Sequence, residues 1–213
     1  MSAPLSPSVR SLLAGAPRPL LSRTAEGRLG PRHRQLLDDL EALFRARGFA
    51  DFTVGGLADA LGCSRRTLYE IAPSKEQLVL LVLDRFLHRL GRAALERIDP
   101  DTPLAEQIRD YVIGGVELRL ADALVEDLAE DAPARRLVDR HVEFSRTVVE
   151  RLVERGIRAG ELRPVNAPVA AAVITASAFH LARPRMPART GLELSDALAE
   201  VCDVVLQGLL PRP

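Results

Sequence analysis

Apolar residues recur along this chain every three or four positions, the spacing that places them on one face of an α-helix. In the stretch 32–47 the inward positions are Leu36, Leu37, Leu40, Leu43 and Phe44. No segment alternates apolar and polar residues as a half-buried strand would, and no internal repeat is visible. The pattern therefore predicts an all-α protein of about nine helices.

The longest predicted helix of the first half spans residues 75–98 and opens with a capping box at Ser74. It connects the first half of the chain to a second helical region that starts after an Asp- and Pro-rich break. In that region we expect helices near 104–121, 122–130, 134–159, 166–182 and 192–209. Two prolines, Pro184 and Pro187, predict a loop between the last two helices.

Residues 53–78 contain closely spaced signals for the start and end of helices, and they read TVGGLADALGCSRRTLYEIAPSKEQL. Thr53 and Ser64 are each suited to be the N-cap of a short helix. Gly62 supplies the left-handed residue with which the first of these helices can end, and Pro73 stops the second. Two short helices joined by a tight turn predict a helix-turn-helix, whose second helix enters the major groove of DNA.

The outward side chains of the second short helix suit a DNA partner. Arg65 and Arg66 can each contact guanine or phosphate in a bidentate manner, and the hydroxyls of Thr67 and Tyr69 can bind phosphate. Two adjacent arginines alone would indicate only a solvated helix face, whereas the complete motif favours DNA binding. The predicted DNA-binding residues are Thr53, Ser64, Arg65, Arg66, Thr67, Tyr69, Lys75, Arg32 and Arg34.

With these residues the chain resembles the TetR family of transcriptional regulators. The resemblance covers about residues 32–95 and is carried by Gly48-Phe49, Thr53-Val54, Leu57-Ala58, Gly62-Cys63-Ser64, Thr67-Leu68-Tyr69 and Ser74-Lys75-Glu76. It implies a C-terminal domain that binds a small molecule and a homodimer formed through the last two helices. The chain departs from the family at Ile71-Ala72, where an aromatic residue is usual, and at Glu70. This acid could repel phosphate or accept a hydrogen bond from cytosine N4.

Helix-breaking residues and the distribution of charge divide the chain into three regions. Residues 1–30 read as a disordered arm rich in arginine and proline, either reaching into a minor groove or inert. Residues 31–98 form the helix-turn-helix domain with its connecting helix, and residues 99–213 form a helical domain, for which the resemblance implies effector binding and dimerisation. Residues 1–98 hold 15 Lys and Arg against 10 Asp and Glu, a balance of +5, and residues 99–213 hold 14 against 19, a balance of −5. The basic half is the half that carries the DNA-binding motif.

Pairing and ligand binding are predicted for the second region. Small residues between Val169 and Ala182 allow close helix approach, and the helix 192–209 is apolar on more than one side, as a helix between a core and a partner would be. A fully buried helix in a monomer is the alternative. Polar or aromatic residues in apolar helices are the ligand-binding candidates, and the aliphatic composition favours an apolar ligand. The candidates are Tyr111, Glu117, His141, Phe144, Ser145, Phe179 and His180.

Other chemistry finds little support in the sequence. Its two cysteines lie far apart and favour a reduced, cytoplasmic protein, and no spacing of metal ligands, cofactor-binding loop or catalytic motif is present. The acidic pairs Glu126-Asp127 and Glu130-Asp131 read as a solvated surface. We therefore expect no enzyme, cofactor or metal. The resemblance implies a repressor that a small, apolar ligand releases from a palindromic operator. The alternatives are a helical ligand-binding protein or enzyme with a vestigial DNA domain, and a protein-interaction module.

Overall fold

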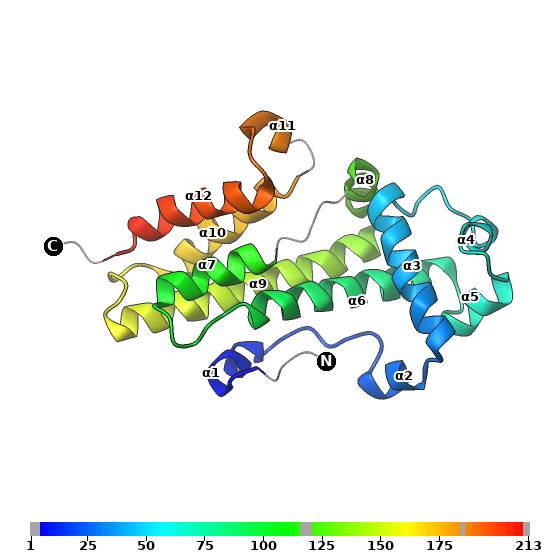
Figure 1. Ribbon diagram of the computed structural model, residues 1–213, viewed down its shortest axis with the longest axis horizontal. Coiled ribbons are helices and arrows are strands. Elements are labelled where there is room, and N and C mark those ends of the chain that lie inside the picture. Colours follow the sequence, from blue (N-terminus) through cyan, green and yellow to red (C-terminus); the bar gives the residue numbers. More distant parts are fainter. Residues whose placement is uncertain (1–4, 116–120, 184–185, 211–213) are drawn as a thin grey trace. The chain divides into compact units, whose positions relative to one another are not determined.

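The computed structural model describes residues 5–115, 121–183 and 186–210, and over these ranges it contains helices and no strand, as the periodicity predicted. Figure 1 shows the helices in chain order. They form two compact units. The N-terminal unit comprises Arg18–Arg89 and Leu120–Asp139, and the C-terminal unit comprises Met1–Pro17, Leu90–Arg119 and Arg140–Pro213. Helices α6 (Lys75–Glu96) and α9 (Ala132–Ala159) have residues in both units.

The N-terminal unit is built around the apolar stripe of α3 (Pro31–Arg47). Its other helices are α2 (Arg23–Arg28), α4 (Val54–Ala60), α5 (Arg65–Ile71), the start of α6 and α8 (Asp122–Glu130). Leu37, Leu40 and Phe44 of α3 are buried with Leu57 of α4 and Leu68 of α5. Phe49 meets the ring of Phe44 edge to face, with ring centroids 6.0 Å apart. This core holds the two short helices in place, since helices of seven residues are not stable alone.

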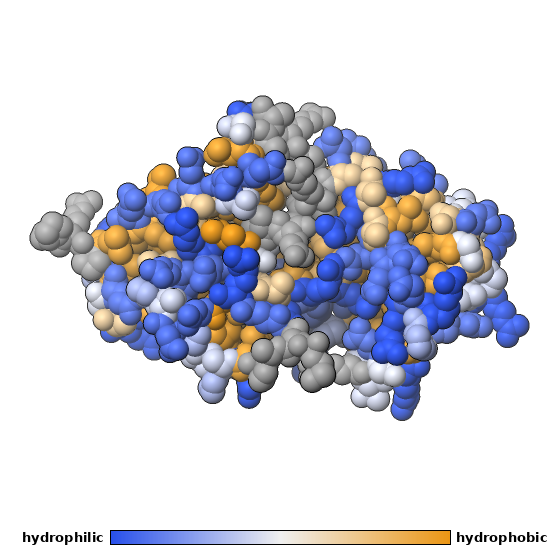
Figure 2. Space-filling view, viewed as in Figure 1, coloured by the Kyte–Doolittle hydropathy of each residue, from blue (hydrophilic) through white to orange (hydrophobic). Residues whose placement is uncertain are grey.

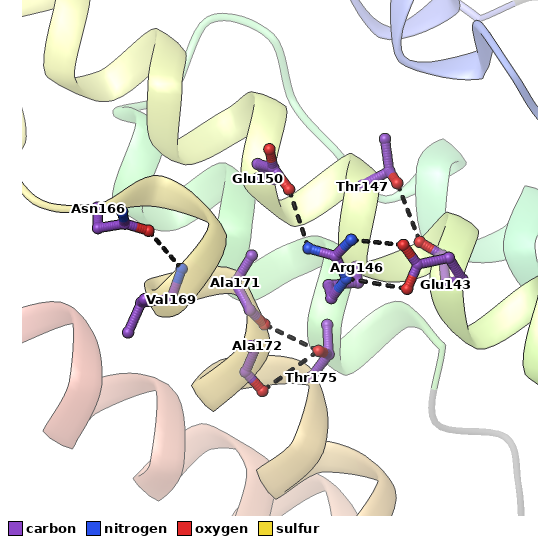
Figure 3. A network of polar contacts seen from close by, with 9 residues as sticks. All are labelled: Glu143, Arg146, Thr147, Glu150, Asn166, Val169, Ala171, Ala172 and Thr175. Carbon is purple, nitrogen blue, oxygen red and sulfur yellow. Dashed lines mark hydrogen bonds and ion pairs between the residues drawn. The ribbon is translucent and has the colours of Figure 1, made fainter.

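The C-terminal unit contains α1 (Pro7–Arg10), a 3₁₀ turn (Ser11–Leu13), α7 (Leu104–Gly114), most of α9, α10 (Ala167–Leu181), α11 (Met186–Thr190) and α12 (Leu194–Gln207). Helix α12 packs against both α10 and α7. The core is aliphatic, with Ile108, Val149, Leu152 and Ile174 all fully buried. Figure 3 shows polar groups beside it, where Asn166 caps α10 and Arg146 of α9 pairs with Glu143 and Glu150.

Most predicted helices lie where the periodicity placed them, with ends shifted by a few residues. The helix expected at 104–121 ends at Gly114, and residues 116–120 lie outside the described ranges. The loop expected around Pro184 and Pro187 contains the short helix α11. Pro187 stands in the first turn of α11, where a proline costs no intrahelical hydrogen bond.

Two observations differ from the expected domain organisation. The arm expected to be disordered forms α1 and the 3₁₀ turn, where Val9 and Leu12 are buried in the C-terminal core, and α2, where Glu26 pairs with Arg85 of α6. Helix α8, expected in the effector domain, packs against α3 in the N-terminal unit with Leu124 fully buried.

Candidate nucleic-acid interface

The helix-turn-helix is held by the caps that its sequence predicts. Thr53 Oγ1 accepts from the Gly56 amide at 3.0 Å, and Ser64 Oγ accepts from the Thr67 amide at 3.1 Å. Ser74 Oγ likewise accepts a hydrogen bond from the Gln77 amide at 3.2 Å, at the start of α6. Gly62 adopts φ +58°, the left-handed conformation that a glycine reaches at little cost. These local bonds fix where each short helix starts, and so which residues of α5 face outward.

Helix α5 has one buried face and one exposed face. Leu68 is 1% exposed and anchors the helix in the core. Arg65 and Arg66 are exposed, and Tyr69 is 51% exposed. Thr67 is half-buried, and its hydroxyl lies 2.9 Å from that of Ser64. The exposed face thus presents two guanidinium groups and a phenol from a rigid helix, which is suitable for contacts with bases and phosphates.

The two arginines of this face differ in their surroundings. Arg66 Nε lies 3.4 Å from Glu70 Oε1, and the second oxygen of Glu70 lies 3.3 Å from His33 Nε2 of α3. Arg65 lies over Gly55 of α4, where an added Cβ would come within 2.7 Å of Nη2. Gly55 therefore leaves room for the Arg65 side chain, a role that the sequence pattern did not reveal.

The remaining predicted DNA-binding cations are placed around α5. Lys75 Nζ donates to the Ala50 carbonyl at 2.7 Å, and Arg32 Nη2 lies 3.5 Å from the Gly62 carbonyl oxygen. Arg34 is exposed on α3. Lys75 therefore braces the loop before α4, and Arg32 lies against the turn between α4 and α5.

Asp127 of α8 has a structural role that the sequence did not suggest. Its Oδ2 accepts hydrogen bonds from the Phe49 amide and, at 2.9 Å, from the Ala50 amide. These amides follow Gly48, whose φ is +72° and where a Cβ would meet the Asp127 carboxylate at 2.4 Å. With Lys75 on the Ala50 carbonyl, the loop before α4 is held from both sides.

The predicted ligand-binding residues are only partly brought together. Tyr111 is buried, and its hydroxyl donates to Ser145 Oγ at 3.2 Å. Burial raises the pKa of Tyr111 to about 12, and the bond to Ser145 partly opposes this rise. Phe144 packs beside the same core and His141 is half-buried.

The other candidates do not join this group. Phe179 and His180 are exposed on α10, and Glu117 lies outside the described residues. Of the predicted ligand-binding residues, the structure therefore joins Tyr111 and Ser145 by a hydrogen bond.

Helix α10 carries an exposed apolar stripe. Val169 is 60% exposed, Val173 48% and Phe179 40%, and on α12 Val204 is 76% exposed. Figure 2 shows apolar surface, in orange, reaching solvent over these C-terminal helices. Exposed apolar residues gathered on adjacent helices are typical of a protein–protein interface.

The fold and this surface define a helical DNA-binding protein with an N-terminal helix-turn-helix. Residues 36–82 match the family model of bacterial regulatory proteins, tetR family. Among curated relatives, the uncharacterized HTH-type transcriptional regulator YvaF of Bacillus subtilis is 24% identical over 180 residues, 83% of this chain and 94% of YvaF. The chain therefore carries a helix-turn-helix domain of the tetR family of transcriptional regulators.

Two solved structures share the fold. A putative transcriptional regulator from Saccharomonospora viridis in complex with choline superposes with a TM-score of 0.72 at 15% identity, over 85% of this chain and 98% of that one. FadR from Bacillus subtilis in complex with stearoyl-CoA superposes with a TM-score of 0.68 at 14% identity, over 83% and 99%. Within the described residues no helix is both long and apolar enough to cross a membrane.

Proposed function

We propose that this chain is a homodimeric repressor that binds a roughly palindromic operator and leaves it when a small apolar ligand binds the C-terminal unit. The observation that carries the proposal is the exposed face of α5, where Arg65, Arg66 and Tyr69 stand on a helix anchored by buried Leu68. Direct readout needs such a rigid helix with outward guanidinium groups. DNA binding also implies a location where DNA is present, the cytoplasm.

The dimer is supported by the apolar stripe of α10 and by Val204 of α12. Two copies joined through these helices would remove the exposed Val169, Val173 and Phe179 from water. An interface of this kind is isologous, so the two recognition helices would be related by a twofold axis. Such a pair reads two half-sites spaced about 34–36 Å apart, which is why the operator should be roughly palindromic.

The ligand site is supported by buried Tyr111 and its hydrogen bond to half-buried Ser145, in a unit whose buried side chains are mostly aliphatic. A few polar groups among apolar side chains can orient an apolar ligand, as small-molecule sites generally do. The complexes of the two structural neighbours, with choline and with stearoyl-CoA, support a ligand in this unit. The mostly aliphatic core of the C-terminal unit favours an acyl or other apolar group.

The test is binding of the purified protein to the DNA upstream of its own gene and neighbouring genes, measured by fluorescence anisotropy across a salt series. The control is Thr67→Ala/Tyr69→Ala, which leaves buried Leu68 in place. Tight binding to one fragment, weakened by the two substitutions and by salt, supports the proposal. Equal and weak binding to every fragment would refute specific recognition.

A further inference from the structure

The N-terminal segment is docked on the C-terminal unit, although it precedes the DNA-binding motif in the chain. Ser6 Oγ caps α1 by accepting from the Val9 amide at 3.3 Å. Val9 is 2% exposed and Leu12 is fully buried, and both belong to the core of the C-terminal unit. Residues 6–14 therefore complete the core that surrounds the proposed ligand site.

Two arginines of α9, one helical turn apart, hold this segment. Arg151 Nη1 donates to the carbonyls of Leu12, at 2.9 Å, and Ala14, at 2.7 Å. Arg155 Nη2 donates to the Ser8 carbonyl at 3.0 Å and to the Ser11 hydroxyl. Guanidinium groups suit the carbonyls at the end of a helix, which have no intrahelical donor. The α9 surface is thus a docking site for a short peptide, and the chain's own N-terminus occupies it.

The segment that follows is fixed on the N-terminal unit. The Leu20 amide donates to Asp84 Oδ2 at 2.8 Å, and Asp84 is 1% exposed. Glu26 of α2 pairs with Arg85 Nε at 3.2 Å, and Arg85 also pairs with Asp38 of α3. Breaking the bond to a buried carboxylate is costly, so this end is firmly held.

Only residues 15–19 connect the two docked ends. They read Gly-Ala-Pro-Arg-Pro, and the two prolines restrict the backbone. The six Cα–Cα steps from Ala14 to Leu20 extend at most about 20 Å. A connection this short limits how far the two docked ends can separate, whereas a long flexible linker would not.

We propose that residues 5–26 form a strap that couples the ligand-binding unit to the DNA-binding unit, with the Arg151–Arg155 face of α9 as its docking surface. The inference rests on the proposed function and adds a connection separate from α6. A ligand that perturbs the core around Val9 and Leu12 would change the docking of the strap. The strap also limits the relative arrangements of the two units in the free protein. A larger fraction of the molecules is then competent to bind the operator.

The test lengthens the strap without undocking it. Ten Gly and Ser residues are inserted between Ala16 and Pro17, and the matched control carries the same insertion before Leu5. We expect the operator Kd of the strap insertion to rise about tenfold, within the range of coupling energies between linked sites. The melting temperature and the hydrogen-exchange protection of residues 8–14 should stay unchanged. An unchanged Kd with the segment still protected would overturn the proposal.

A second variant and a second readout separate a coupling role from a merely structural one. Arg151→Ala/Arg155→Ala should expose residues 8–14 to exchange and raise the Kd as much as the insertion does, with no further rise when both changes are combined. Spin labels at Asp59→Cys and Glu200→Cys, in a Cys63→Ser/Cys202→Ala background diluted with unlabelled protein, should show a broader distance distribution after the insertion. The distance measurement needs no DNA. A failure to find an operator would therefore refute the proposed function, and the spin-label distances would still test the strap. An unchanged distribution would refute the strap.

Discussion

Asp127→Ala should loosen the loop that precedes the helix-turn-helix. The substitution removes the acceptor of two backbone amides, one on Phe49, which is 4% exposed, and one on Ala50, which is exposed. A hydrogen bond to a charged group contributes about 1.5–3 kcal/mol when buried, and the exposed one contributes less. We therefore expect the N-terminal unit to lose about 2–4 kcal/mol of stability.

Native-state hydrogen exchange measures this loss directly, because it reports the opening of individual amides. The Phe49 and Ala50 amides should exchange far faster in Asp127→Ala, and the urea midpoint of the N-terminal unit should fall. The exchange rates and the urea midpoint of Asp127→Asn should lie between those of wild type and Asp127→Ala, since the side-chain oxygen of Asn still accepts a hydrogen bond. The matched control is Glu126→Ala, a neighbouring exposed acid on the same helix. If Asp127→Ala and Glu126→Ala behaved alike, the loop would not depend on α8.

Three further substitutions test the units separately. Leu68→Ala should cost about 3 kcal/mol in urea unfolding, because it empties a fully packed position beneath α5; a loss below about 1 kcal/mol would contradict that packing. Val173→Glu should convert the dimer to a monomer in analytical ultracentrifugation, while Arg158→Glu on exposed α9 should not, and a persistent dimer would exclude the α10 stripe. Tyr111 has a folded-state pKa of about 12 against an ordinary value of 10.0, so its protonated form is favoured in the fold. The stability that the fold gains from this preference is fully present below pH 10 and is lost as pH rises toward 12. Wild type should therefore lose up to about 2–3 kcal/mol relative to Tyr111→Phe over that window, and parallel profiles would contradict the burial.

The helix-turn-helix could be predicted from the sequence because its signals are local. Thr53, Ser64 and Ser74 each cap the helix that follows by accepting from the amide three residues further on, and Gly62 lies where α4 ends, so no knowledge of distant contacts is needed. The period of the apolar residues then placed Leu68 inside and Arg66 outside.

The long-range features could not be predicted in this way. Asp127 lies 78 residues from Phe49, and Arg151 lies 139 residues from Leu12. Charge and proline content made residues 1–30 read as disordered, while two apolar side chains, Val9 and Leu12, dock part of them. An acid in a polar run looks solvated until the fold brings backbone amides to it, which only tertiary structure shows.

The central claim is that α5 reads DNA sequence, and base discrimination by its arginines tests this most directly. The Kd values of wild type, Arg65→Ala and Arg66→Ala should be compared on the operator and on a scrambled duplex at fixed salt, with Arg136→Ala, an exposed arginine of α9, as the control. At least one α5 variant should lose about 1–3 kcal/mol of binding free energy on the operator and much less on the scrambled duplex, while Arg136→Ala should discriminate as wild type does. Equal losses on both duplexes would mean that α5 supplies only charge, and no loss on either would place the DNA-binding surface elsewhere.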